Sequence, residues 1–257
     1  MLIDSHCHLD RLDLSKQNNS LAQALDDARL QGVSHFLCVS IDLEAYPAML
    51  AMVEEFPDVS VSVGVHPCEI ESQEPSVEDL LERAKHPKVV AIGETGLDYF
   101  HHKGDMAWQQ NRFRVHIEAA KQCKKPLIVH CRDAKADTLD ILEQEGAIDA
   151  RGIMHCFVDD WETAKRAMDI GFLISFSGIV TFKSARDLQE VARKVPLEYM
   201  LVETDSPYLA PMPYRGKPNQ PAYVRKVAEY LADLKGISFE ALAEATSNNF
   251  RNLIQIN

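Results

Sequence analysis

The sequence lacks several features that would place it in other protein classes. No apolar run reaches the roughly 18 residues that a membrane-spanning helix needs, and the first residues include Asp4, His6 and His8 where a signal peptide is apolar. The six cysteines form no CxxC pair and are spread along 257 residues, which argues against a zinc knuckle and a disulfide scaffold. We therefore expect a cytoplasmic protein with reduced cysteines and no membrane segment.

Basic residues are also in short supply. Lys and Arg number 27 against 39 Asp and Glu, which gives a formal net charge of −12. Broad coating of duplex nucleic acid depends on Lys and Arg at the phosphates, so it is not expected here. An anionic substrate remains compatible with this charge if bound metal ions and a few arginines receive it.

Long linkers, low-complexity tracts and the glycine-rich G-x-G-x-x-G phosphate turn are absent as well. Instead, eight short apolar runs alternate with amphipathic stretches of helical period. The apolar runs are 2–6, 33–40, 59–66, 89–94, 126–131, 152–156, 171–178 and 199–205. Their number and length predict an α/β fold, a (β/α)8 TIM barrel that forms a single domain over residues 1–257. Two extra C-terminal helices, about 222–235 and 238–255, are expected to close the barrel and fold over its C-terminal rim.

Histidines and carboxylates gather where the predicted strands end. His6 and His8 lie two positions apart, so both imidazoles project to the same side of the first strand. Because the active-site residues of a barrel lie at the carboxyl ends of its strands, we expect these side chains to converge. The strand-end residues are His6, His8, His66, Glu94, His130, His155, Glu203 and Asp205.

This set fits two metal ions better than one, since a catalytic zinc usually takes three protein ligands. We predict that Glu94 bridges the two ions. The other predicted ligands are His6, His8 and Asp205 for one ion and His130 with His155 for the other. Two ions that share a hydroxide and hold both the attacking and the leaving oxygen suit phosphoester hydrolysis, and to a lesser degree amide or ester hydrolysis.

The sequence resembles the TatD family of metal-dependent deoxyribonucleases, which belongs to the metallo-dependent hydrolase superfamily. The resemblance includes the opening HxH, GETGLDY (93–99), the histidines that end predicted strands 5 and 6, ETDSPYLAP (203–211), RGKPN (215–219) and SNNFRNLI (247–254). It implies a divalent-metal-dependent DNase that acts as a 3′→5′ exonuclease on single-stranded or damaged DNA. The family's metal residues fall on His6, His8, Glu94, His130, His155 and Asp205.

Two groups of residues receive further roles. Asp205 and Glu94 are the predicted catalytic residues, and Asp205 is expected to orient the attacking water and accept its proton. An arginine at the rim can take a phosphate bidentately, although an ordinary surface ion pair is an equally good reading of Arg132 and Arg215. The full set of predicted substrate-binding residues is His66, Tyr99, Arg132, Glu203 and Arg215.

The expected cofactor is a pair of divalent ions, and Mg, Mn and Zn all remain open. Four imidazoles favour zinc, manganese, iron or nickel by ligand preference, whereas the resemblance implies magnesium-supported activity. The expected partner is DNA, single-stranded or at 3′ ends, with no obligate protein partner. A small phosphoester, ester or amide metabolite is the alternative substrate. A non-catalytic barrel is a third reading, but it predicts gaps in a ligand set that is complete here.

Overall fold

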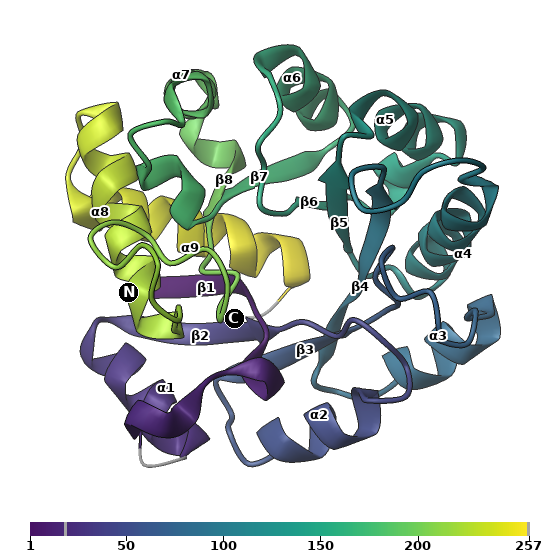
Figure 1. The fold of residues 1–257 in the computed structure, drawn as a ribbon, viewed down its shortest axis with the longest axis horizontal. Coiled ribbons are helices and arrows are strands. Elements are labelled where there is room, and N and C mark those ends of the chain that lie inside the picture. Colours follow the sequence, from purple (N-terminus) through teal and green to yellow (C-terminus); the bar gives the residue numbers. More distant parts are fainter. Residues whose placement is uncertain (18–19, 256–257) are drawn as a thin grey trace. The chain divides into compact units, whose positions relative to one another are not determined.

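The computed structural model describes residues 1–17 and 20–255, and Figure 1 shows its strands and helices. The strands follow one another in the sheet in chain order, and each described pair is parallel, as in a (β/α)8 barrel. The predicted fold class is thereby confirmed. The strands are β1 (Leu2–Cys7), β2 (Val33–Cys38), β3 (Val59–Val63), β4 (Val89–Asp98), β5 (Leu127–Arg132), β6 (Gly152–Met154), β7 (Phe172–Phe176) and β8 (Met200–Val202).

Helices separate the strands, as the amphipathic stretches predict. Ser20 and Ser76 begin two of them with side chains that accept a backbone N–H of the first turn, a contact that replaces a missing helical hydrogen bond. In the part of the chain that the structure describes, no helix is long and apolar enough to cross a membrane. The helices are α1 (Leu21–Leu30), α2 (Tyr46–Val53), α3 (Val77–Ala84), α4 (Ala107–Cys123), α5 (Lys135–Gln144), α6 (Trp161–Asp169), α7 (Arg186–Lys194), α8 (Val224–Lys235) and α9 (Phe239–Ile254).

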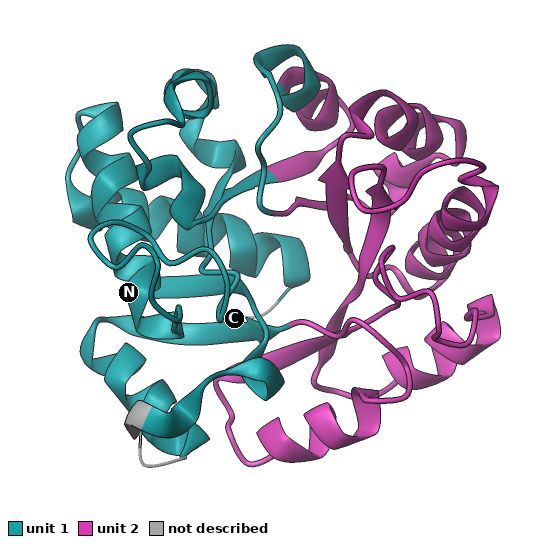
Figure 2. Ribbon diagram, in the orientation of Figure 1, with its two compact units in different colours: residues 1–38, 156–164, 174–257 teal, residues 39–155, 165–173 magenta. Residues whose placement is uncertain are grey.

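The residues group into two compact units, which Figure 2 colours separately. Unit 1 comprises residues 1–38, 156–164 and 174–257, and unit 2 comprises residues 39–155 and 165–173. Neither unit is continuous in the sequence. A single domain over residues 1–257 therefore stays a prediction, and each unit is described by itself below.

Unit 1 contains both ends of the chain. Within it β1 pairs with β2, β7 pairs with β8, and Cys7 at the end of β1 forms a parallel bridge with Ser206. Helices α8 and α9 pack on each other and on β1 and β8. Phe36 and Phe250 are among the largest fully buried side chains of this unit.

The last helix lies elsewhere than predicted. In α9, Ser247 Oγ donates to the carbonyl oxygen of Met1 at 2.9 Å, and Asn249 Nδ2 donates to that of Met200 at 2.9 Å. These carbonyls stand where β1 and β8 begin, so the expectation that α9 folds over the carboxyl ends of the strands was wrong. The physical reason is that backbone carbonyls at a strand start need donors, and the polar face of α9 supplies them.

Unit 2 carries the longest strand of the sheet. β4 has ten residues, of which nine are buried, and it pairs with β3 on one side and β5 on the other. Helices α3 and α4 pack on β4, and α5 packs on β5. Because β4 continues from Glu94 to Asp98, both carboxylates are held by a paired strand and not by a loop.

Candidate metal sites

Unit 1 brings His6, His8 and Asp205 together, and we call these three residues the unit 1 ligand group. His8 Nε2 lies 3.4 Å and His6 Nε2 lies 3.7 Å from Asp205 Oδ1, and the two Nε2 atoms are 3.3 Å apart. His6 is fully buried, His8 is 4% exposed, and the Asp205 side chain is 13% exposed. Three of the six predicted ligands therefore meet within one unit.

Backbone hydrogen bonds between the ends of β1 and β8 set the spacing of this group. The N–H of Asp205 donates to the carbonyl of His6 at 2.9 Å, and the N–H of His8 donates to that of Ser206 at 2.8 Å. Asp205 adopts a left-handed φ of 55°, a conformation that aspartate accepts more readily than most residues. The carboxylate is thus turned toward the two imidazoles by the backbone itself.

A buried carboxyl holds the backbone beside Asp205. The two oxygens of Asp4 contact the N–H and the hydroxyl of Thr204 at 2.8 and 2.6 Å. Burial raises the pKa of Asp4 to about 8, although both contacts with Thr204 oppose the rise. Glu203, predicted to bind substrate, is fully buried, and its Oε1 accepts the N–H of Cys156 at 2.8 Å.

Unit 2 brings three imidazoles to one carboxylate oxygen, and we call this set the unit 2 ligand group. The nitrogens of His155, His130 and His66 lie 2.9, 3.2 and 3.3 Å from Glu94 Oε1. Glu94 and His155 are almost fully buried, whereas the side chains of His66 and His130 are 17% and 18% exposed. The sequence predicted His66 only as a substrate contact, and its position also makes it a candidate ligand.

Two glycines let the backbone approach this group. A Cβ on Gly96 would lie 2.0 Å from the carbonyl oxygen of His130, and one on Gly93 would lie 2.7 Å from that of Ile128. Both glycines also have positive φ values, 130° and 142°, which side chains disfavour. The GETG segment therefore permits the close pairing of β4 with β5 that places Glu94 beside His130.

Asp98 orients one of these imidazoles, and the sequence analysis did not single it out. Its Oδ2 atom lies 3.0 Å from His130 Nε2, on the side of the ring away from Glu94. Burial acts to raise the pKa of Asp98, but hydrogen bonds from His130 and His101 outweigh it and hold the pKa well below its usual value. Four positions separate Asp98 from Glu94 on one strand, and this even spacing is the signal that was available.

The pKa values of two imidazoles in the unit 2 ligand group, His66 and His130, shift in opposite directions. Burial lowers the pKa of His66 and outweighs the effect of Glu94. Burial acts on His130 in the same sense, but the carboxylates of Asp98 and Glu94 prevail and raise its pKa. A neutral imidazole is the form that binds metals, and a carboxylate behind the ring fixes which nitrogen faces the ion.

The donor atoms of each group are spaced like ligands around an ion. Zinc–nitrogen bonds of about 2.0–2.1 Å at tetrahedral angles separate neighbouring ligand atoms by about 3.3 Å. The measured contacts to the carboxylate oxygen are 3.4–3.7 Å in unit 1 and 2.9–3.3 Å in unit 2. Imidazole nitrogen with carboxylate oxygen suits zinc, manganese and related divalent ions, so the residues present fit a metal in each unit.

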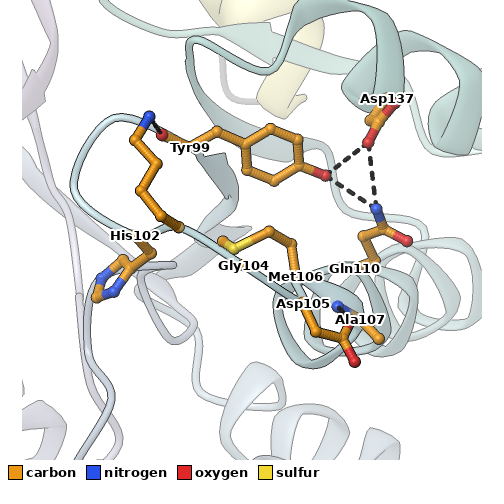
Figure 3. Close-up of a pocket in the computed structure, with 9 residues that line it drawn as sticks. Tyr99, His102, Gly104, Asp105, Met106, Ala107, Gln110 and Asp137 are labelled. Atoms are coloured by element: carbon orange, nitrogen blue, oxygen red, sulfur yellow. Dashed lines mark hydrogen bonds between the residues drawn. The ribbon is translucent and has the colours of Figure 1, made fainter.

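The remaining predicted substrate residues have other neighbours. The hydroxyl of Tyr99 contacts Asp137 and Gln110 at 2.7 and 2.9 Å and helps to line a polar pocket of about 390 Å³, shown in Figure 3. The exposed guanidinium of Arg132 lies 4.5 Å from the ring centroid of Phe100. That of Arg215 lies 4.3 Å from the ring of Phe182. Their roles in substrate binding stay predictions.

Comparisons with known proteins agree along nearly the whole chain. The family described as TatD related DNase matches residues 3–255. The chain is 50% identical over 256 residues to YcfH of Escherichia coli strain K12, described as an uncharacterized metal-dependent hydrolase, and the match covers 99% of this chain and 96% of that protein. YabD of Bacillus subtilis strain 168, described in the same words, is 39% identical over 258 residues, with full coverage of both. The crystal structure of YjjV, a TatD homologue from Escherichia coli, is 28% identical with a TM-score of 0.90 and covers 100% of this chain and 98% of that one.

Proposed function

This chain belongs to the TatD-related DNase family of metal-dependent hydrolases, and we propose that it hydrolyses phosphodiester bonds of DNA with two divalent ions. One ion is assigned to the unit 1 ligand group and the other to the unit 2 ligand group. The observation that carries the proposal is that each unit has its own set of imidazoles around a carboxylate oxygen. Two complete sets fit two ions, because a single catalytic zinc usually uses three protein ligands.

When bound, the ions supply a water of lowered pKa and Lewis-acid stabilisation of the phosphoryl oxygens. Asp205 would orient that water and accept its proton, because its carboxylate is the partly exposed member of the unit 1 group. Glu94 holds the imidazoles of unit 2 around one oxygen and would be the carboxylate that the two ions share when both are bound. Asp98 keeps His130 in a fixed ring orientation, so that the same nitrogen always faces Glu94.

A cationic pocket in unit 1 supports a polyanionic substrate. The exposed side chains of Lys183 and Arg186 and the half-buried Lys226 line a pocket of about 470 Å³, together with Gln189 and Tyr230. The exposed Lys183 and Arg186, beside a Lys226 that pairs with Glu229 at 2.8 Å, contrast with the net charge of −12 of the whole chain. Phosphates are the groups that lysine and arginine attract most strongly, so this pocket is assigned to the DNA backbone.

An exposed aromatic residue, Tyr208, supports single-stranded DNA as the substrate. Tyr208 is 49% exposed, and its ring centroid lies 6.1 Å from that of His8 in the unit 1 ligand group. Unpaired bases stack on such rings whatever their sequence. Cleavage from the 3′ end is proposed from the family resemblance.

A small phosphoester metabolite is the second candidate substrate. The acidic composition of the chain favours it, because long nucleic acids meet repulsion outside a local cationic pocket. Both candidates use the same two ligand groups, so metal content alone does not separate them.

The test uses protein that is stripped of metal and reloaded with Mg²⁺, Mn²⁺ or Zn²⁺. It receives a 5′-labelled single-stranded oligonucleotide or bis(p-nitrophenyl) phosphate, with His6→Ala as the matched control. Stepwise shortening from the 3′ end that is absent in His6→Ala supports the proposal. Turnover of the small ester alone would favour a small phosphoester metabolite as the substrate. If neither compound is hydrolysed with any of the ions, the proposal is overturned.

The proposed bridge has a separate test. With two Mn²⁺ ions bound, a shared Glu94 carboxylate is expected to give the spin-coupled electron paramagnetic resonance spectrum of a manganese pair. Two uncoupled Mn²⁺ signals in an active enzyme would contradict the bridge but leave the two ligand groups in place.

A further inference from the structure

Unit 2 contains a second cluster of metal-binding side chains, separate from the unit 2 ligand group. It consists of Cys68, which follows β3, Asp98 at the end of β4, and His101 in the next loop. One donor atom from each residue lies within 4.8 Å of the others. His101 Nδ1 lies 2.9 Å from Asp98 Oδ2 and 3.9 Å from Cys68 Sγ.

These distances fit three ligands of one ion. With metal–sulfur bonds of about 2.3 Å and metal–nitrogen bonds of about 2.0–2.1 Å, a tetrahedral ion separates its sulfur and nitrogen ligands by about 3.5 Å. The observed sulfur–nitrogen separation exceeds this by a few tenths of an ångström. Small rotations of the Cys68 and His101 side chains are enough to bring both atoms to bonding distance.

The backbone aims the Asp98 carboxylate at this cluster. Its Oδ1 atom accepts the N–H groups of Phe100 and His101 at 3.0 and 2.8 Å, which leaves Oδ2 toward the Cys68 and His101 side chains. Asp98 is fully buried, whereas the His101 side chain is 54% exposed. The cluster therefore has a rigid buried ligand and an outer ligand through which an ion can enter from solvent.

The surroundings favour a cation. Besides Asp98, the carboxylates of Glu94 and Glu69 put negative charge near the sulfur of Cys68. Burial and this negative charge raise the pKa of the Cys68 thiol to about 12, so an ion that binds there displaces the thiol proton. A thiolate, an imidazole and a carboxylate form a donor set that selects zinc-like ions over magnesium, since magnesium prefers oxygen ligands throughout.

We propose that Cys68, Asp98 and His101 form a zinc-type metal site distinct from both ligand groups. The site adjoins the unit 2 ligand group through one atom, because Asp98 Oδ2 also lies 3.0 Å from His130 Nε2. An ion on Oδ2 withdraws electron density from the carboxylate that orients His130. Occupancy of this site therefore tunes the neighbouring ligand group, whatever substrate the enzyme hydrolyses.

The test is a titration of the metal-free protein with Co²⁺, in which the near-ultraviolet absorption of the protein is recorded after each addition. A thiolate bound to Co²⁺ gives an intense charge-transfer band, and neither ligand group contains a cysteine. We expect the band in the parent protein and its loss in Cys68→Ser. The matched control is Cys123→Ser, a half-buried cysteine in α4 that lies outside the cluster and is expected to keep the band.

Two further measurements complete the test. Cys68→Ser is expected to bind one zinc equivalent fewer than the parent protein, and His101→Ala is expected to weaken the Co²⁺ affinity of the thiolate band about tenfold or more. Thermal unfolding of each variant checks that it folds. Absence of the band in the parent protein, or its survival in folded Cys68→Ser, overturns the site. Neither result depends on DNA hydrolysis, so failure here is distinguishable from failure of the proposed function.

Discussion

The two ligand groups are built in different ways. In unit 1, two of three ligands come from alternate positions of one extended segment, the HxH at the end of β1, and only Asp205 comes from elsewhere. In unit 2, Glu94 receives imidazoles from the ends or loops of three other strands. The unit 1 group therefore depends mainly on a local motif, whereas the unit 2 group depends on the register of β4 with its neighbours.

Their supporting residues differ as well. Asp4 stabilises the backbone beside Asp205 and touches no imidazole of the group. Asp98, in contrast, contacts the His130 ring directly. We therefore expect the chemistry of unit 2 to respond more strongly to changes behind the ligands than that of unit 1.

The largest effect is expected from Glu94→Ala. This change removes the carboxylate that three imidazoles of unit 2 share, so turnover is expected to fall about 10³-fold or more, which corresponds to about 4 kcal/mol. Steady-state kinetics and elemental analysis measure the loss of activity and of metal together. A variant that keeps two bound ions and full turnover would contradict the central role of Glu94.

The next effect concerns His116, which supports unit 2 by accepting the N–H of Val65 at 2.9 Å. Burial lowers its pKa from 6.5 to about 4. Because the folded pKa is the lower one, its contribution is present above pH 6.5 and is lost as the pH falls toward 4, by on the order of 3 kcal/mol. Chemical unfolding of the parent protein and His116→Gln at several pH values is expected to show the steeper acid loss in the parent.

Asp4 in unit 1 gives the folding stability the opposite dependence on pH. Its folded pKa of about 8 lies above the ordinary 3.8, so its contribution is present below pH 3.8 and is lost as the pH rises toward 8. Asp4→Asn is expected to remove this loss on the alkaline side. Parallel unfolding curves for the parent and both variants would contradict the assigned protonation states.

A smaller effect is expected from Asp98→Asn. Loss of the carboxylate behind His130 is expected to lower the metal affinity of unit 2, the turnover or both by about 10–100-fold. It also removes the main partner that raises the pKa of His130, so metal binding is expected to extend to lower pH. Asp140→Asn, which removes an exposed partner of Arg166, is the matched control. An unchanged pH profile of metal binding would leave Asp98 with a purely structural role.

The smallest effect is expected in the cationic pocket. Lys183→Ala and Arg186→Ala are each expected to raise KM for an oligonucleotide about three- to tenfold, with unchanged kcat and unchanged turnover of bis(p-nitrophenyl) phosphate. Each change is also expected to reduce the salt dependence of binding by about one charge. Lys85→Ala, an exposed lysine paired with Glu82, serves as the control. Equal effects on both substrates would argue against a phosphate-binding pocket.

Much of this architecture could be predicted because each strand has a recognisable pattern of neighbouring residues in the sequence. Apolar runs with a polar residue at the end located all eight strands, and the residues of both ligand groups were among the strand-end positions, since side-chain alternation needs only neighbouring residues. The position of α9 could not be predicted in this way, because it depends on hydrogen bonds from Ser247 and Asn249 to carbonyls far away in the sequence.

The supporting residues show the same limit. Asp98 had a readable signal in its even spacing from Glu94, but Cys68 lies in a loop, where no periodicity assigns a direction to a side chain. Lys183 and Arg186 meet Lys226 only in three dimensions. Contacts of this kind depend on tertiary packing, which local patterns do not encode.

The absence of a side chain at Gly96 has a consequence for redesign. The atom that a Cβ would strike is the backbone oxygen of position 130, which every amino acid possesses. Position 96 is therefore closed to other residues whatever side chain stands at 130. For the ion proposed in unit 2, exchange of the imidazole at position 130 for a carboxylate is expected to shift the preference toward magnesium, because magnesium prefers oxygen ligands.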